Sequence, residues 1–299
     1  METYYYFAPL LGGCAIALLP AINNYVSEYT KSIGFIIAIN FALGAALLSI
    51  VYAIYYPVSV SVIWKVPTWK LLGGVYGTLT VVVITITPAK IGVGKTLSIF
   101  IVARLASATV IDHFGWLSMP IDPITLSKGI GVFLALVGAV FVLRVRALKR
   151  QKVHVFNLYV VLCILSGFSS SMQSSTNAAL LSEVDSFIFV TWANFIQNAL
   201  CFILVYFFIF RKDIAIYQSV KTYFLGVTSA LTSMVVITMM ALGSGKIGVA
   251  VTVVFSIITQ LITAMTIDHF GWFRVARHTF SYKSILGFLC LTTGAYLII

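Results

Sequence analysis

Hydrophobic residues fill most of this 299-residue chain in long stretches, and short polar segments separate the stretches. Ten of them approach the roughly 20 residues that a helix needs to cross the hydrocarbon core of a bilayer. The stretches cover residues 7–26, 33–56, 70–87, 91–111, 126–146, 156–181, 186–210, 220–242, 247–267 and 283–299. The pattern predicts an all-α integral membrane protein with ten transmembrane helices, and it leaves almost no chain for a soluble domain.

The composition supports this prediction. Hydrophobic residues make up 61% of the chain and charged residues only 9%, whereas a soluble domain carries about 25% charged residues. The four cysteines lie inside apolar stretches, without a Cys-x-x-Cys spacing or a neighbouring histidine. We therefore predict no disulfide framework, no metal site and no cofactor. The first stretch lacks a basic segment ahead of it and a clear cleavage site, so we interpret it as a retained helix.

Two segments recur along the chain. IDHFGW occupies residues 111–116 and again 267–272, and KIGVG at 90–94 returns as KIGVA at 246–250. With a small change in spacing, Asn23 aligns with Asn177 and Asn40 with Asn194. These matches predict two five-helix units, residues 1–150 and 151–299. Because five is an odd number, the second unit enters the membrane in the opposite orientation, an inverted repeat that is common in secondary transporters.

The net charge of +11 is distributed unevenly between the two sides of this predicted topology. Fourteen basic residues fall on one side: Lys31, Lys90, Lys95, Arg144, Arg146, Lys149, Arg150, Lys152, Arg211, Lys212, Lys221, Arg274, Arg277 and Lys283. Four fall on the other: Lys65, Lys70, Lys128 and Lys246. The positive-inside rule places the richer side in the cytoplasm and both termini outside. The basic segment 144–152 then faces anionic lipid, so we expect membrane lipid as a partner and no nucleic acid.

Arg104 stands near the middle of the fourth stretch, where an arginine costs about 2.5–3.5 kcal/mol on insertion scales. Its counterpart in the second half is Gln260, and each lies eight residues before the aspartate of IDHFGW. Two interpretations stay open. Arg104 projects into a cavity and binds an anionic group of a substrate, or it forms hydrogen bonds with backbone carbonyls and Asn side chains as a structural tie.

Other polar groups lie within the apolar stretches. The sixth stretch has a stripe at helical spacing formed by Ser166, Ser170, Gln173 and Asn177. We predict that Gln173 and Asn177 line a cavity. Asn23, Asn40 and Asn194 either line the same space or form interhelical hydrogen bonds. No Asp or Glu lies deep in any stretch, which favours neutral or anionic solutes over cations.

The repeated IDHFGW motif has two interpretations. In one, its polar residues act in gating or ion coupling; these are Asp112, His113, Asp268 and His269. In the other, which we favour, Asp and His tie down a helix end. The glycines, Gly115 and Gly271, then let the chain turn, and the tryptophans anchor it at the membrane interface.

These motifs resemble the drug/metabolite transporter superfamily (EamA-like), and more narrowly a fused pair of the small five-helix bacterial proteins of the YdcZ type. The resemblance rests on the two IDHFG segments, on Gln260, on Gln173 and Asn177 as Q-x-x-x-N, and on the two KIGV segments. It implies a ten-helix inverted repeat in the bacterial inner membrane, with a central cavity and peripheral fifth and tenth helices. The first half departs from the pattern, because Arg104 replaces Gln and Leu19 replaces the Gln of Q-x-x-x-N.

We therefore predict a secondary carrier or facilitator that moves a small polar or anionic metabolite by alternating access. The alternative is a membrane scaffold or regulatory subunit that transports nothing. An enzyme is not predicted, because the four histidines include no His-Glu-x-x-His and no paired carboxylates lie in mid-membrane. The sequence leaves the oligomeric state open, with a homodimer as one candidate.

Overall fold

The computed structural model describes residues 3–56, 58–91, 93–146, 158–211, 220–274 and 282–298. Within these ranges the chain forms ten long α-helices and one short one, with no strand. The α-helices are α1 (Phe7–Thr30), α2 (Ile33–Tyr55), α3 (Gly73–Ile86), α4 (Pro88–Ile91), α5 (Val93–Phe114), α6 (Leu126–Arg146), α7 (Leu158–Val184), α8 (Phe187–Val205), α9 (Val220–Ile247), α10 (Val249–Phe270) and α11 (Tyr282–Ile298). The described part of the chain therefore confirms the all-helical prediction.

Within the described ranges, six helical segments are long and apolar enough to cross a membrane. They are Phe7–Thr30, Ile33–Tyr55, Thr68–Ile86, Phe187–Phe210, Val220–Ile247 and Val249–Ile267. The helices α5 and α7 fall outside this set, and α6 and α11 contain only shorter apolar segments among the described residues. Ten spans therefore remain a prediction, whereas ten long helices at the expected places are observed.

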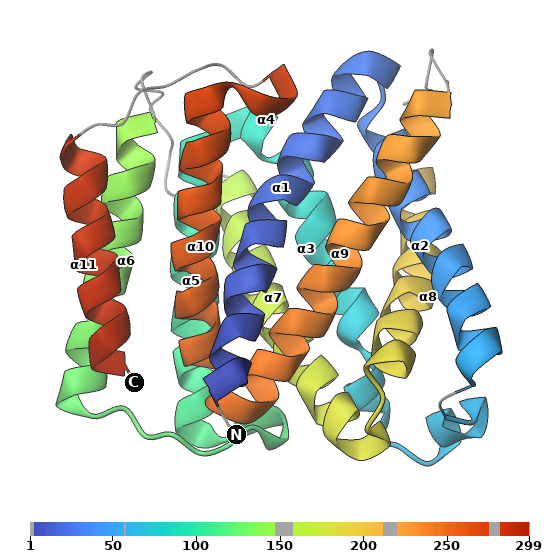
Figure 1. Ribbon diagram of the computed structural model, residues 1–299, viewed down its shortest axis with the longest axis horizontal. Coiled ribbons are helices and arrows are strands. Elements are labelled where there is room, and N and C mark those ends of the chain that lie inside the picture. The colour runs from blue at the N-terminus through green and yellow to red at the C-terminus, as the bar shows by residue number, and fades with distance from the viewer. Residues whose placement is uncertain are drawn as a thin grey trace.

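The helices stand side by side in one bundle, and the N- and C-termini lie at the same end of it (Figure 1). Equivalent helices of the two halves run in opposite directions, as α1 and α7 show (Figure 1). The repeat extends to the helix caps. Ser32 Oγ accepts the Phe35 N–H at 3.0 Å at the start of α2, and Ser186 Oγ accepts the Phe189 N–H at 3.2 Å at the start of α8. The boundary between the predicted units, near residue 150, lies outside the described residues.

The two halves interlock through their third helices. α3 of the first half packs against α7 and α8, while α9 of the second half packs against α1 and α2. The fourth helices cross over in the same way, since α5 packs on α7 and α10 packs on α1. Each half therefore completes the interior of the other, and groups placed there come from both halves.

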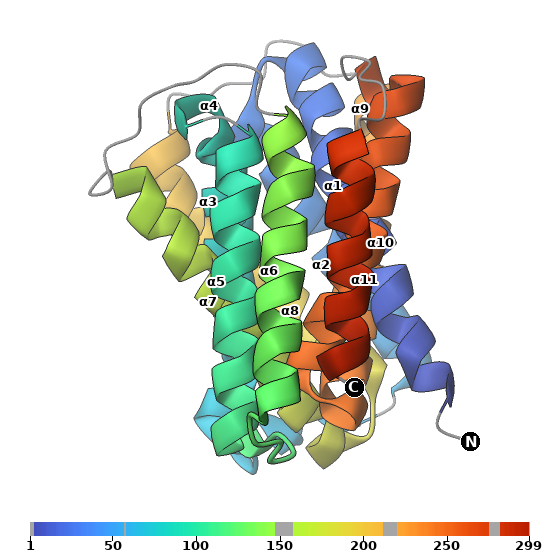
Figure 2. The same cartoon turned by 90° about the vertical axis from the view of Figure 1, so that its left-hand side faces the viewer.

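The fifth helices of the halves, α6 and α11, form a pair at one edge of the bundle (Figures 1 and 2). Glycines permit their close contact: a Cβ on Gly138 would lie 2.4 Å from the carbonyl oxygen of Gly287, and one on Gly131 would lie 2.7 Å from that of Gly294. The peripheral position that the family resemblance implies for these helices agrees with this arrangement.

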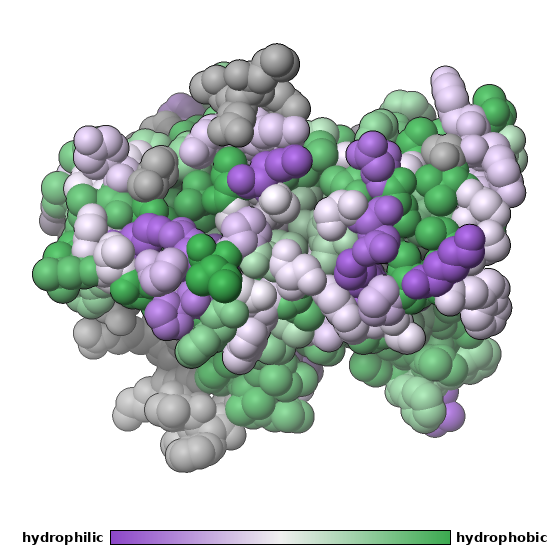
Figure 3. All heavy atoms as spheres, turned by 90° about the horizontal axis from the view of Figure 1, so that it is seen from below, coloured by the Kyte–Doolittle hydropathy of each residue, from purple (hydrophilic) through white to green (hydrophobic). Residues whose placement is uncertain are grey.

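Hydrophilic residues run across the end of the bundle that carries the termini, and hydrophobic residues flank them (Figure 3). Many large apolar side chains on the sides of the bundle are exposed, among them Phe133 at 63%, Leu204 at 63% and Phe208 at 85%. An exposed apolar surface of this extent is expected where lipid is the solvent.

Candidate functional site

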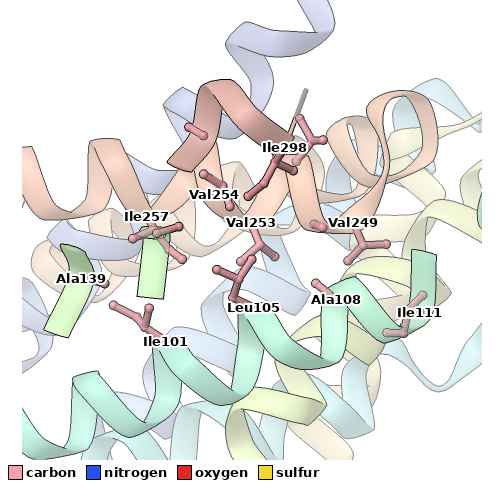
Figure 4. Packing of buried hydrophobic residues seen from close by; sticks show 14 of the residues in the cluster. Ile101, Leu105, Ala108, Ile111, Ala139, Val249, Val253, Val254, Ile257 and Ile298 are labelled. Carbon is pink, nitrogen blue, oxygen red and sulfur yellow. The ribbon is translucent and has the colours of Figure 1, made fainter. Parts of the chain in front are cut away.

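The helices α5 and α10 meet through aliphatic side chains in the middle of the bundle. Ile101, Leu105 and Ala108 of α5 face Val253 and Ile257 of α10 (Figure 4), and these residues belong to one buried cluster. Arg104 directly precedes Leu105, so helical geometry puts it on the flank of this apolar contact. Only 1% of its surface is exposed.

The guanidinium of Arg104 has very few partners. Its Nη2 lies 3.7 Å from the sulfur of Met240 on α9, a weak acceptor, and its Nε and Nη1 have no hydrogen-bond partner among the described residues. Gly12 of α1 also lies against Met240, because a Cβ there would be 3.2 Å from that sulfur. Helices from both halves thus surround a buried positive charge whose hydrogen-bonding capacity is largely unused.

The backbone of Arg104 is held much more firmly than its side chain. Its carbonyl oxygen accepts hydrogen bonds from Ser171 Oγ of α7 at 2.7 Å and from Ser107 Oγ at 3.0 Å. Gly167 lets α7 come this close, since a Cβ there would lie 2.8 Å from the backbone nitrogen of Arg104. α7 therefore fixes the position of α5 at this point and leaves the guanidinium unbound.

Gln260 occupies the equivalent place on α10. Its surface is 6% exposed, and its Oε1 has no hydrogen-bond partner among the described residues. Arg104 and Gln260 form no hydrogen bond with each other. In the described part of the chain two further buried side-chain oxygens have no partner, Ser244 Oγ on α9 and Thr252 Oγ1 on α10. All such atoms in the described ranges belong to α5, α9 or α10.

The asparagine and glutamine side chains of the second half lie together. Asn177 of α7 and Asn194 of α8 exchange hydrogen bonds of 2.7 and 3.3 Å, and Gln173 Nε2 donates to Asn194 Oδ1 at 3.4 Å. Gly73 of α3 lies directly against this pair, because a Cβ there would be 2.0 Å from Asn177 Oδ1. The cluster joins α7 and α8 to the third helix of the other half.

The first half has a matching cluster at the equivalent place. Asn40 Nδ2 of α2 donates to Ser229 Oγ at 2.6 Å and to Ser233 Oγ at 3.0 Å, both on α9. Ser229 Oγ in turn donates to Asn23 Oδ1 of α1 at 2.7 Å. The structure thus brings Asn23 together with Asn40, and Asn177 with Asn194, but in two separate groups. All four amides have protein partners, as interhelical hydrogen bonds require.

Asp112 of the first IDHFGW holds the start of α10. Its carboxylate accepts the N–H of Val249 at 2.9 Å and that of Ala250 at 2.6 Å, and only 2% of its surface is exposed. Gly248, just before α10, has a φ of +86°, which non-glycine residues rarely adopt. The first copy of IDHFGW is therefore hydrogen-bonded to KIGVA, the second copy of the KIGV segment. This contact joins the two halves.

The two IDHFGW turns share one conformation. Gly115 and Gly271 have φ angles of +63° and +67° at the helix ends. Phe114 stacks on Trp116 in the first copy, and Phe270 stacks on Trp272 in the second. His113 Nδ1 accepts the N–H of Ile124 at 3.1 Å and so holds the following loop. His269 is exposed beside Phe270, and the side chain of Asp268 lies outside the described residues.

Sequence reasoning missed several groups that contact the predicted residues, among them Ser229, Ser233 and Met240 of α9. Ser229 and Ser233 stand one helical turn apart on α9, and that spacing was the signal that could have pointed to them. Nothing in the sequence singles out Met240, whose place beside Arg104 depends on how α9 meets α5.

The fold is that of an α-helical membrane protein with two repeated, oppositely directed halves, an architecture common among transporters. The sequence matches the family model DMT_YdcZ, described as "Putative inner membrane exporter, YdcZ", over residues 4–141 and again over 158–297. The chain belongs to this family and carries its unit twice. It is accordingly a membrane transporter, and the resemblance to the drug/metabolite transporters is confirmed.

The fold is also known from solved structures. One, described only as "Crystal structure of protein", matches with a TM-score of 0.67 at 15% identity, over 97% of this chain and 95% of its own. At this identity the match shows the fold alone. No curated protein matches the sequence.

Proposed function

We propose that this protein is a secondary carrier that exports a small anionic metabolite by alternating access, with Arg104 as a ligand of the solute. The observation that carries the proposal is the guanidinium of Arg104, which is buried in the bundle with two nitrogens unpartnered among the described residues. The description of the family as exporters supports the direction.

A buried charge needs a compensating group, because its removal from water costs several kcal/mol. The ion pairs of the described residues, Lys70–Glu183 and Lys128–Asp122, do not involve Arg104. Asp112, the buried carboxylate two turns further along α5, is occupied by the N–H groups of α10. An anionic group on a solute would provide the charge-assisted hydrogen bonds that the protein itself does not supply.

The unpartnered oxygens support the same place for the solute. Gln260, Ser244 and Thr252 each keep a buried oxygen without a partner, and Gln260 is the repeat counterpart of Arg104. Nearly all buried polar atoms in native structures have a hydrogen-bond partner, so atoms without one are candidate positions for a ligand or water. We propose that Gln260 completes the site. Gln173, Asn177, Asn194, Asn23 and Asn40 would form its walls as the two hydrogen-bonded clusters.

Alternating access requires contacts that open on one face at a time. The bond between Asp112 and the start of α10 joins the halves at the end of the bundle that carries the termini. We propose that it closes that face and breaks when the face opens. Because of the repeat, we propose that Asp268 closes the opposite face in the same way. His113 and His269 follow the two aspartates in the adjoining turns. We propose, from the distribution of the basic residues, that the face with the termini lies outside the cell.

The first experiment is a thermal-shift screen of purified protein against small organic anions, run in parallel on Arg104→Gln. That change installs the residue of the second half and removes the charge. We expect carboxylates or phosphates of one class to raise the Tm of the wild type by mass action and to leave Arg104→Gln unchanged. Lys65→Gln, an exposed position at the end of the bundle that carries the termini, is the matched control for lost charge.

Two outcomes contradict the proposal. An equal response of wild type and Arg104→Gln to every ligand would mean that Arg104 does not bind the solute. No response of either protein to any anion, together with no efflux from proteoliposomes loaded with the same compounds, would favour the scaffold or regulatory subunit. If a ligand is found, efflux that Arg104→Gln abolishes and Lys65→Gln retains would establish transport.

A further inference from the structure

Two positive side chains converge on one tyrosine at the end of the bundle opposite the termini (Figure 1). Lys221 Nζ lies 5.4 Å from the centre of the Tyr25 ring, and the guanidinium carbon of Arg274 lies 5.5 Å from the same centre. Lys221 also donates a hydrogen bond of 3.1 Å to the Tyr25 hydroxyl. The three residues come from the end of α1, the start of α9 and the 3-10 turn after α10, so separate elements build this cluster.

These cations have no carboxylate partner in the part of the chain that the structure describes. The described ion pairs, Lys70–Glu183 and Lys128–Asp122, belong to the end of the bundle that carries the termini. Two like charges that share one ring repel each other, and among the described residues no carboxylate takes up their remaining N–H groups. The start of a 28-residue helix, α9, adds the positive end of its dipole at the same place. An anion is the group that such a cluster lacks.

The repeat shows that this cluster is an addition to the fold. Arg274 stands where the first half has Ser118, in a turn of the same conformation, with φ angles of +61° and +59°. Tyr25 stands where the second half has Ala179. The turn therefore forms without an arginine, and the equivalent positions of the repeat, Ser118 and Ala179, carry neither this charge nor this ring.

The geometry suits a phosphate group. The Tyr25 oxygen accepts from Lys221, which leaves its own O–H to donate, and Arg274 offers the planar fork of donors that fits phosphate oxygens. Trp272, two residues before Arg274, is 49% exposed and is stacked on Phe270. Tryptophan prefers the interface of a membrane, which puts the cluster at the depth of the lipid headgroups.

We propose that Tyr25, Lys221 and Arg274 form a binding site for a phosphate-type anion, supplied by the headgroup of an anionic phospholipid. The site does not depend on the proposed solute, because it lies at a helix end and not beside Arg104. Bound lipid would tie α1, α9 and the turn after α10 together at this face.

The test is the thermal stability of the full chain in detergent, titrated with phosphatidylglycerol, with phosphatidylcholine or with inorganic phosphate. Phosphatidylglycerol should raise the Tm of the wild type, and phosphatidylcholine should not. Arg274→Ser installs the residue of the other turn. In this variant the phosphatidylglycerol concentration that gives half of the Tm increase should rise about fivefold, the factor expected for one cation near a lipid surface. Tyr25→Phe keeps the ring and loses the hydroxyl, so it should weaken the response with less risk to folding.

Lys246→Ser is the matched control, because Lys246 lies 5.6 Å from the ring of Tyr5 at the other end of the bundle, as a single cation on a single ring. It should respond as the wild type does. If inorganic phosphate acts like the lipid and with the same dependence on Arg274, the site holds but its anion is soluble. If Arg274→Ser and Tyr25→Phe both respond to phosphatidylglycerol as strongly as Lys246→Ser, the proposal is wrong.

Discussion

Arg104 is the residue at which stability and the proposed function oppose each other. Its backbone is bonded to two serines, whereas its guanidinium has only a sulfur atom as a partner among the described residues. A buried charge without a counter-charge destabilises a fold, and such groups persist where they serve a ligand. The sequence identified this residue and the free-energy cost of placing an arginine inside the membrane. It could not tell a bound from an unbound guanidinium, because that depends on which side chains of α7 and α9 reach it.

Replacing Arg104 by Met should therefore stabilise the protein when no ligand is present. We expect Arg104→Met to raise the Tm in detergent by at least about 2 °C, because an unbranched apolar side chain then replaces a desolvated charge. Arg104→Lys keeps the charge and should bring no gain. A lower Tm for Arg104→Met than for the wild type would show that the guanidinium is a structural tie, the other interpretation of the sequence.

At the scale of elements, the repeated motifs act as helix ends. The carboxylate of Asp112 satisfies two of the N–H groups that begin α10, and Gly115 turns the chain after α5. The sequence predicted that the motif ends a helix, because glycine and aromatic residues follow an apolar run. It did not reveal that the aspartate caps a helix of the other half, since that partner is more than 130 residues away.

Loss of this cap should be measurable. Asp112→Ala removes both acceptors and should lower the free energy of unfolding by about 1–2 kcal/mol, in the range of helix caps in other proteins. The matched control is Asp122→Ala, which removes a carboxylate from a partly exposed ion pair with Lys128 and should change stability by less than about 1 kcal/mol. Equal effects of the two substitutions on thermal unfolding would argue against the cap.

The pairing of α6 with α11 provides a second test at this scale. A methyl group on Gly138 would meet the backbone of α11 at 2.4 Å, so Gly138→Ala should force the helices apart and lower the Tm. Gly129 lies on the same helix with its nearest neighbour at 3.8 Å, so Gly129→Ala should be neutral or slightly stabilising through helix propensity. Tolerance of both changes would contradict the close contact.

At the scale of the whole molecule, the two halves share one interior, because the third helix of each half packs against the first two of the other. Neither half can bury its polar groups alone, as the Asn40–Ser229 and Asn177–Asn194 clusters show in their contacts with α9 and α3. A change in the angle between the halves would therefore alter both ends of the bundle together, which is what alternating access needs.

The orientation of the bundle in the membrane can be tested by cysteine labelling in a variant without the four native cysteines. Leu148→Cys, in the basic connection between the halves, should resist an impermeant thiol reagent applied to intact cells. Ser61→Cys, an exposed position at the end that carries the termini, should react. The opposite result at both positions would invert the predicted topology.

The sequence by itself determined the class of the fold and its symmetry. Long apolar runs indicate helices in a bilayer. Two copies of IDHFGW and KIGV at matching places indicate a repeat. Both signals can be read from the sequence because they are local or periodic along the chain. Only the tertiary structure decided the partners. The amides that pair, the helix that Asp112 caps and the near absence of partners for Arg104 among the described residues all depend on how the helices cross in the bundle. Hydrophobic patterns do not encode those crossings.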